Sequence, residues 1–179
     1  MLIILLSGSA GSGKSVAATL LAKTLLPFRP HMAAFSHAVK VEASELHGFP
    51  VQLCHTPEGK ATIIETEAGP MTVGDILTCY ERDMRMAHGD DWWARKVVDK
   101  IRTIGAEGPW IINDCASLIE AQVMKGSFPE ARLVIIHIER PGAPRTYAAD
   151  PAPVSHVIVN DGTRDDLERQ VGACIRQYL

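Results

Sequence analysis

Short apolar runs alternate with longer amphipathic stretches along most of the chain. Five of these runs are mostly apolar and have the length of a buried strand. They are Leu2–Leu6, His31–Ser36, Trp110–Asn113, Leu133–Ile138 and Val157–Val159. Because helical patterns separate the runs, we expect an α/β fold: a parallel sheet with right-handed crossovers and helices on both of its faces.

Six further stretches have the composition or the apolar spacing of helices. They are Lys14–Leu26, Val39–His47, Thr72–Met86, Asp90–Ile104, Ser117–Lys125 and, approximately, Thr163–Tyr178. Pro27 ends the first of them, because a proline ring clashes with the preceding helical turn. Thr72 and Thr163 are typical of the capping position at a helix start.

The stretch Val51–Met71 interrupts this alternation. It contains two turn-forming sequences, Thr56–Gly59 and Ala68–Pro70, between short β-like pieces, which predicts a small β-hairpin excursion. A chain of 179 residues is long enough for one buried core. We therefore expect a single domain over residues 1–179, with an insertion over about 50–104.

The sequence GSAGSGKS, residues 8–15, directly follows the first apolar run and directly precedes the first helical stretch. It fits the pattern GxxxxGK[ST], in which backbone N–H groups of a glycine-rich loop and a helix start hold phosphate groups. Lys14 would reach the outer phosphates of ATP or GTP, and the Ser15 hydroxyl would face Mg²⁺. Because both flanks match the context of the motif, nucleotide binding is favoured over a chance glycine-rich turn. The expected contacts are Gly8, Gly11, Ser12, Gly13, Lys14 and Ser15.

Charge and cysteine usage argue against several other classes of protein. Lys and Arg number 18 against 21 acidic residues, so there is no overall basic field that would attract nucleic acid. The four cysteines have no CxxC or zinc-finger spacing, which fits a reducing cytoplasm. The opening apolar run is too short to span a membrane and lacks the basic start of a signal peptide. We expect small-molecule partners, no nucleic acid, no membrane, and a homodimer as an option.

Asp114 directly follows the apolar run Trp110–Asn113, at the edge of the predicted sheet where ligands bind in open α/β folds. An acidic residue there can hold magnesium or its waters, although aspartate is also common in ordinary strand-to-helix turns. No NKxD motif follows a strand, which argues against a GTPase switch. A chain of this length without a basic excess fits a helicase or motor poorly, so a kinase of a small acceptor remains.

Seven segments occur in this order along nearly the whole chain: GSAGSGKS, FSHAVKVEASELHGF, TVGDILTCYERDMR, GDDWWARKV, WIINDCASLIEAQVMK, VIIHIERPG and VIVNDGTRDDLERQV. In this ordered set the sequence resembles the phage-type deoxynucleoside monophosphate kinases, a branch of the P-loop nucleoside monophosphate kinases. This resemblance implies the three-layer P-loop fold with strands in the order 2-3-1-4-5. It also implies ATP-dependent phosphorylation of a deoxynucleoside monophosphate (dNMP), with magnesium, in the host cytoplasm if the protein is phage-encoded.

Because two phosphate-bearing substrates meet in this reaction, positioned arginines are expected beside Lys14. Arg82 and Arg85 are one helical turn apart and would present guanidinium groups to one monophosphate, although a solvated helix face explains the same spacing. Arg140 and Arg145 flank PGAP in a loop over about 139–155 that resembles a short lid. A plain surface loop is the alternative. Lys14, Arg140 and Arg82 are the expected catalytic residues.

The remaining candidate residues are placed by the resemblance. Asn160 and Gly162 belong to the turn NDGT, near which the donor adenine packs in the family; a strand-to-helix turn capped by Thr163 is the alternative. The acceptor contacts would be Ser36, Lys40, Asp91, Trp92 and Asp114. A tryptophan pair at a helix start also fits simple core packing. No catalytic base is expected, because the acceptor phosphate is already ionised.

The chain departs from the family pattern at two places. Residues 114–117, DCAS, lack the arginine that phage relatives tend to have after the strand-end aspartate, and TVGDILTCYERDMR keeps its motif poorly. Two other functions therefore stay open. One is a kinase of a sugar or shikimate-like hydroxyl compound, with Asp114 as the base. The other is a non-catalytic module in which ATP sets a conformation for a partner.

Overall fold

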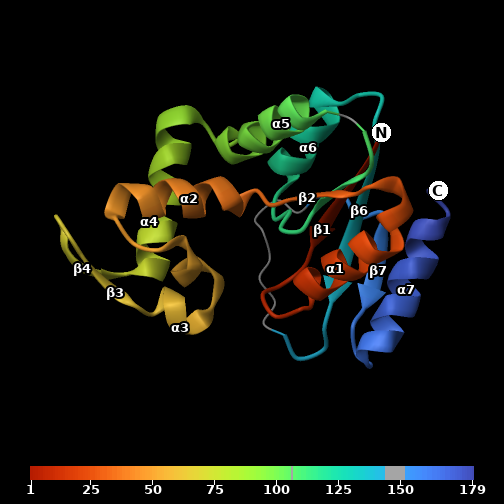
Figure 1. Cartoon of the computed structure of the whole chain (residues 1–179), viewed down its shortest axis with the longest axis horizontal. Coiled ribbons are helices and arrows are strands. Elements are labelled where there is room, and N and C mark those ends of the chain that lie inside the picture. Colours follow the sequence, from red (N-terminus) through yellow and green to blue (C-terminus); the bar gives the residue numbers. More distant parts are fainter. Residues whose placement is uncertain (106, 144–151) are drawn as a thin grey trace. The chain divides into compact units, whose positions relative to one another are not determined.

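The structure is a computed structural model that describes residues 1–105, 107–143 and 152–179 (Figure 1). The chain forms two compact units. Unit 1 comprises Met1–Ala34 and Val97–Leu179, and unit 2 comprises Phe35–Lys96. Within the described ranges, no helix combines the length and the apolar character needed to cross a membrane.

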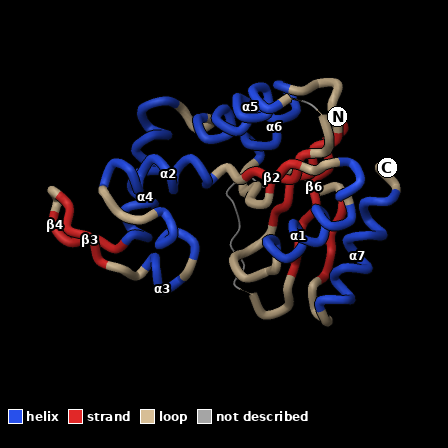
Figure 2. The backbone as a smooth tube through the Cα atoms, viewed as in Figure 1, coloured by secondary structure: helices blue, strands red, loops and turns tan. Residues whose placement is uncertain are grey.

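A five-stranded parallel sheet forms the centre of unit 1 (Figure 2). In spatial order its strands are β2 (His31–Ala33), β5 (Trp110–Ile112), β1 (Leu2–Ser7), β6 (Arg132–Glu139) and β7 (His156–Val159). Counted along the chain within this sheet alone, the order is 2-3-1-4-5, since β3 and β4 form a separate hairpin. The predicted fold class and strand order are therefore confirmed.

Both faces of the central strand β1 are fully buried. Ile4 points to the face that is covered by α1 (Lys14–Thr24) and α7 (Arg164–Arg176), which share one apolar cluster with it. Ile3 alternates to the opposite face and is equally inaccessible to solvent. Burial on both faces is typical of parallel strands that are joined by helical crossovers. The glycine-rich loop thus begins directly after the carboxyl end of a strand that is buried on both faces.

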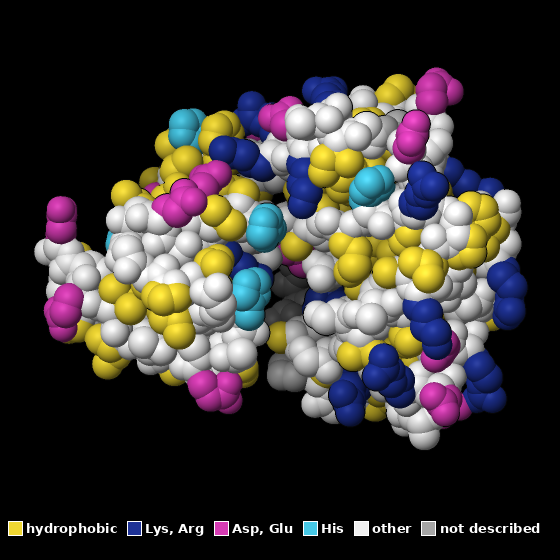
Figure 3. Space-filling model, in the orientation of Figure 1, with side chains coloured by type: hydrophobic (Ala, Val, Ile, Leu, Met, Phe, Trp, Pro, Cys, Tyr) yellow, Lys and Arg dark blue, Asp and Glu magenta, His cyan; other side chains and the backbone are white. Residues whose placement is uncertain are grey.

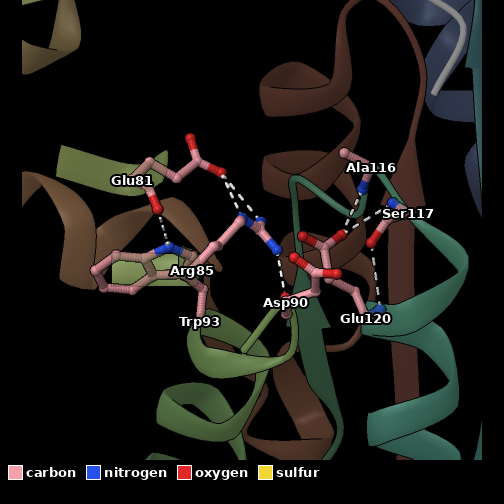
Figure 4. Close-up of polar contacts among 7 residues, drawn as sticks. All are labelled: Glu81, Arg85, Asp90, Trp93, Ala116, Ser117 and Glu120. Carbon is pink, nitrogen blue, oxygen red and sulfur yellow. Dashed lines mark hydrogen bonds and ion pairs between the residues drawn. The ribbon is translucent and has the colours of Figure 1, made fainter. Parts of the chain in front are cut away.

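Capping boxes set the starts of two helices in unit 1. At the start of α6 (Leu118–Ser127), the Ser117 hydroxyl accepts a hydrogen bond from the backbone N–H of Glu120 (Figure 4). In return, the carboxylate of the buried residue Glu120 accepts a hydrogen bond of 3.1 Å from the Ser117 N–H. Thr163 and Asp166 make the same reciprocal pair at the start of α7. Each box satisfies N–H groups that a helix start otherwise leaves without partners.

Unit 2 has an apolar core of its own. Its buried members are Ala43, Phe49, Cys54, Val73 and Ile76. They come from both long helices of the unit and from the irregular segment between them. The elements are α2 (Ser36–His47), a 3₁₀ segment (Val51–His55), α3 (Pro57–Lys60), β3 (Ile63–Thr66), β4 (Gly69–Thr72), α4 (Val73–His88) and the first residues of α5 (Trp92–Ile104).

Unit 2 differs from the expected insertion in two respects. It begins at Phe35, before the predicted start near residue 50, because α2 contributes Ala43 to its core. The predicted hairpin is present as β3 and β4, but Thr56–Gly59, which was expected to be a turn between β-like pieces, caps and begins the short helix α3 instead. There the Thr56 hydroxyl accepts a hydrogen bond from the Gly59 N–H at 3.0 Å and caps α3. Proline in the first turn then favours a helix.

Charged side chains of both signs are interspersed on the face of the molecule that Figure 3 shows. This distribution agrees with the small net charge of −3. This face therefore carries no broad field of positive charge.

Candidate nucleotide and acceptor sites

The glycine-rich loop between β1 and α1 adopts a conformation that its glycines permit. Gly8, Gly11 and Gly13 have φ values of 135°, 76° and 102°, which side chains with a Cβ rarely adopt. A Cβ on Gly8 would lie 2.2 Å from the carbonyl oxygen of Ile138, so the loop runs directly against β6. No described side chain caps the start of α1. Its first N–H groups are therefore available to an anion.

Lys14 folds back across this loop. Its Nζ donates hydrogen bonds to the carbonyl oxygens of Gly8 at 2.7 Å and Ser9 at 2.8 Å. Partial burial lowers the pKa of Lys14, and the nearby Asp114 carboxylate offsets part of this effect. The ammonium group is thus held at the loop by neutral carbonyls, which phosphate oxygens can replace as stronger, charged acceptors.

The two serines of the motif differ in their surroundings. Ser12 is only 1% exposed, and its Oγ has no hydrogen-bond partner among the described residues. A buried hydroxyl without a partner is costly, which favours a ligand or a water at this position. Ser15, in the first turn of α1, is exposed and lines the adjoining cavity. Its hydroxyl is accessible to a metal ion or to phosphate.

Asp114 follows β5, and its charge reaches Lys14. The next residue, Cys115, is buried; this burial, with the charge of Glu120, raises the pKa of its thiol to about 12. The thiol is therefore protonated and a poor nucleophile.

The described part of the chain has no cluster of three His, Cys, Asp or Glu that would form a metal site alone. Ser15 and Asp114 supply oxygen donors that suit Mg²⁺, which takes its other ligands from phosphates and water.

A cavity of about 460 Å³ adjoins the glycine-rich loop. Ser15 lines it from α1, Arg140 from the end of β6, and Asn160 and Gly162 from the turn after β7. The predicted donor-side residues from these segments are thus brought together. Arg164 also lines the cavity, and sequence reasoning missed it because it resembles an ordinary first residue of α7. The volume is in the usual range of small-molecule sites.

Asn160 connects the turn after β7 to the glycine-rich loop, residues 8–15, which we call the phosphate loop. Its side-chain Nδ2 donates a hydrogen bond of 2.9 Å to the Ser12 carbonyl oxygen. A Cβ on Gly13 would lie 2.4 Å from the same nitrogen, so these two segments are in close contact. The sequence predicted a donor contact for Asn160; the structure shows in addition that its amide group holds the loop.

Arg82 and Arg85 line a cavity of about 360 Å³ in unit 2. The Arg85 guanidinium donates to Glu81 Oε1 at 3.0 and 3.3 Å, and also to the Asp90 carbonyl oxygen (Figure 4). Arg82 pairs with Asp83 at 2.9 Å, and its side chain is 63% exposed. Each arginine is therefore already engaged by an acidic neighbour. Their predicted contact with an acceptor phosphate stays a prediction.

Ser36 and Lys40 line a second cavity of unit 2, of about 480 Å³. Lys60 of α3 and the acidic residues Asp75 and Glu81 of α4 line it as well. The sequence did not single out Lys60, because the segment around it was interpreted as part of a hairpin. Only packing of α3 against α4 brings this lysine to the cavity.

Asp91 and Trp92 also have partners within unit 2. The Asp91 carboxylate pairs with Arg95 at 3.1 Å. The Trp92 ring stacks on His88 with 4.2 Å between ring centroids, and Lys96 Nζ lies 4.8 Å from its centre. Stacking of Trp92 on an acceptor base thus stays a prediction.

The expected lid is only partly covered by the structure. Arg145 lies outside the described residues, as do all of residues 144–151 of the loop predicted over about 139–155. Arg140, directly after β6, is exposed and belongs to the cavity beside the phosphate loop.

No protein-family model and no curated protein sequence matches the chain. Several solved structures match its fold. The Mycobacterium tuberculosis APS kinase in complex with AMPPNP and APS has a TM-score of 0.55 and 10% identity, over 95% of this chain and 94% of that chain. A gluconokinase from Sinorhizobium meliloti has a TM-score of 0.52 and 12% identity, over 99% and 93%. The hexameric APS kinase from Thiobacillus denitrificans has a TM-score of 0.55 and 16% identity, over 99% of this chain and 29% of that one. The chain therefore has the fold of P-loop kinases.

Proposed function

We propose that the protein is an ATP-dependent dNMP kinase, which transfers the γ-phosphoryl group of ATP to a dNMP to give a deoxynucleoside diphosphate (dNDP) and ADP. The observation that carries the phosphoryl-transfer part is the phosphate loop. It combines left-handed glycines, an uncapped helix start and the ammonium group of Lys14 within reach of the Asp114 charge. The kinase fold of the structural neighbours supports this part. The identity of the acceptor rests on the ordered motifs that resemble the phage-type kinases.

Catalysis in this proposal is positional and electrostatic. The loop N–H groups and Lys14 bind the transferring phosphate, and Arg140 stabilises the charge that develops on it. No covalent intermediate and no general base are required, because the acceptor phosphate is ionised near neutral pH. This agrees with the neutral, buried thiol of Cys115, which takes no part.

Ser15 and Asp114 are the residues that would hold Mg²⁺ in this site. When bound, the ion would neutralise part of the negative charge on the donor phosphates. The protein groups alone would orient ATP: the adjoining cavity receives the nucleoside beside Arg140 and Asn160.

Unit 2 carries the proposed acceptor contacts. These are Ser36, Lys40, Arg82, Arg85, Asp91 and Trp92. Lys40 is positively charged and lines a cavity with Ser36, whereas the two arginines line another. A nucleotide offers a phosphate for the cations and a base for an aromatic ring, so these residue types suit a dNMP.

A second candidate function is a kinase for a hydroxyl compound. The position of Asp114 favours it, because a carboxylate beside Lys14 has the chemistry of a base for an alcohol. The solved structures of similar fold include a gluconokinase, which is compatible with this second candidate.

A panel of acceptors separates the two functions. ADP formation from Mg-ATP would be measured with each dNMP, each ribonucleoside monophosphate and several sugars, one at a time. Stimulation by a dNMP supports the proposal, and stimulation by hydroxyl compounds alone supports the second candidate. Tight ATP binding without any stimulated turnover would contradict both and would indicate a non-catalytic module. Lys14→Met is the control for contaminating kinases.

A further inference from the structure

The basic residues of unit 2 fall into two groups. Of six lysines and arginines, four form ion pairs with carboxylates in the same unit. These are Arg82 with Asp83, Arg85 with Glu81, Arg95 with Asp91 and Lys96 with Glu42, at 2.9 to 3.1 Å. The other two are Lys40 and Lys60. Neither forms a hydrogen bond or an ion pair with any residue that the structure describes.

These two lysines line the same cavity. Lys40 enters it from α2 and Lys60 from the end of α3, and the volume is about 480 Å³. Both positive charges act on the thiol of Cys54, whose pKa burial raises and the two lysines partly lower. Cys54 is 1% exposed, so both positive charges act on a buried group of unit 2.

The carboxylates of the cavity have other partners. One Asp75 oxygen accepts a hydrogen bond of 2.7 Å from the Thr72 hydroxyl, and Asp75 belongs to the capped first turn of α4. Glu81 is paired with Arg85 at 3.0 Å. Neither carboxylate forms an ion pair with Lys40 or Lys60 among the described residues, so both ammonium groups can pair with an anion that enters the cavity. The cavity is thus suited to an anionic ligand.

We propose that Lys40 and Lys60 together bind the phosphate group of the acceptor. The proposal deepens the proposed function and rests on it for the identity of the acceptor as a dNMP. It assigns phosphate binding to the lysine pair instead of Arg82 and Arg85, because a phosphate at either arginine must compete with an existing ion pair. Ser36 lines the same cavity as the two lysines.

Direct binding tests the assignment without requiring catalysis. The full chain would be titrated calorimetrically with each of the four dNMPs, and with the matching deoxynucleosides, in low-salt buffer without ATP. We expect at least one dNMP to bind, and its affinity to fall about tenfold or more in Lys40→Gln and in Lys60→Gln. Lys60→Arg should retain most of the affinity. Because Lys60 is exposed, added salt should weaken binding.

Three further variants make the result specific. Lys125→Gln removes an exposed lysine of unit 1 whose Nζ bonds only to the Pro129 carbonyl among the described residues, and should bind as wild type does. Arg82→Gln and Arg85→Gln should weaken dNMP binding less than the lysine variants do. Circular dichroism would establish that each variant is folded.

The outcomes separate this inference from the proposed function. Lysine-dependent dNMP binding without phosphoryl transfer would support the phosphate site and refute the kinase. Normal transfer with an unchanged KM for the dNMP in both lysine variants would refute the phosphate site and leave the kinase intact. Absence of dNMP binding to the wild-type chain would overturn the inference directly.

Discussion

The side-chain amide of Asn160 donates a hydrogen bond of 2.9 Å to the carbonyl oxygen of Ser12. The two residues are far apart in sequence: one follows the last strand and the other lies in the phosphate loop after the first. The bond therefore restrains the phosphate loop through a residue outside it, beside the cavity proposed for the donor nucleoside. It links the phosphate loop directly to the turn after β7.

Gly13→Ala should disrupt this arrangement. Alanine at this position would have to adopt φ 102°, which is unfavourable for a residue with a Cβ, and its methyl group would lie 2.4 Å from Asn160 Nδ2. We expect the free energy of unfolding to fall by about 1–3 kcal/mol and ATP affinity to fall about tenfold or more. Urea unfolding and ATP titration measure the two effects.

The contact with Asn160 can be separated from the backbone strain by a double-mutant cycle. Asn160→Ala in the Gly13→Ala background should recover part of the lost stability, because it removes the steric overlap. Strictly additive losses of the two variants would show that the two side groups do not interact.

Lys14→Met should abolish transfer without reducing the stability of the fold at neutral pH. Burial lowers the pKa of Lys14, so its charged form is disfavoured in the folded state relative to the unfolded one. Below the lowered folded pKa this cost is fully present. As pH rises from there to the ordinary lysine pKa, the unfolded chain binds more protons than the folded chain, and stability rises.

The melting temperature of Lys14→Met should therefore equal or exceed that of wild type at pH 7, and the difference should shrink at alkaline pH. Lys125→Met, at an exposed site, is the matched control. A large drop in melting temperature for Lys14→Met at pH 7 would contradict this account of the lysine, and retained turnover would remove it from catalysis.

Arg140→Ala tests the cavity beside the phosphate loop. Arg140 is exposed and lines this cavity with Ser15 and Asn160. We expect kcat/KM for ATP to fall about tenfold to a hundredfold, mainly through kcat if the guanidinium acts in the transition state. Arg176→Ala, at the exposed end of α7, should have little effect. An unchanged kcat/KM in Arg140→Ala would refute the catalytic assignment.

Glu120→Ala should lower the free energy of unfolding more than Asp166→Ala, the equivalent substitution in the capping box of α7, does. Glu120 is 3% exposed, and its carboxylate accepts hydrogen bonds from the N–H groups of Ala116 and Ser117 at 2.7 and 3.1 Å. Its loss should cost about 1–3 kcal/mol of unfolding free energy, because these donors lose their acceptor. Asp166→Ala removes the equivalent but exposed cap of α7 and should have the smaller effect in urea unfolding. Equal losses would show that burial of the cap has no influence.

The sheet and the phosphate loop were predictable from the sequence because their signals are local. An apolar run before GSAGSGKS and a helical pattern after it place Lys14 at the carboxyl edge of β1 with no tertiary information. The capping residues Thr72 and Thr163 were recognisable for the same reason, since a side chain that bonds a nearby N–H is encoded over a few positions.

The cavities were not predictable in this way, because tertiary packing creates them. Lys60 is one of many polar residues in a turn-rich stretch until α3 packs beside α4. The ion pairs of Arg82 and Arg85 with Asp83 and Glu81 depend on side-chain conformations that helical spacing alone does not choose. Thr56-Pro57 fits both a turn and a helix start, and the local sequence does not decide between them.

Phosphoryl transfer to a dNMP is tested most directly by following the phosphate itself. ATP labelled at the γ-phosphate would be incubated with magnesium, the full chain and each dNMP, and the labelled products would be separated and identified. We expect label in the β-phosphate of a dNDP, formed by wild type and absent with Lys14→Met. Label that appears only in inorganic phosphate or in a hydroxyl acceptor would contradict the claim that this chain is a dNMP kinase.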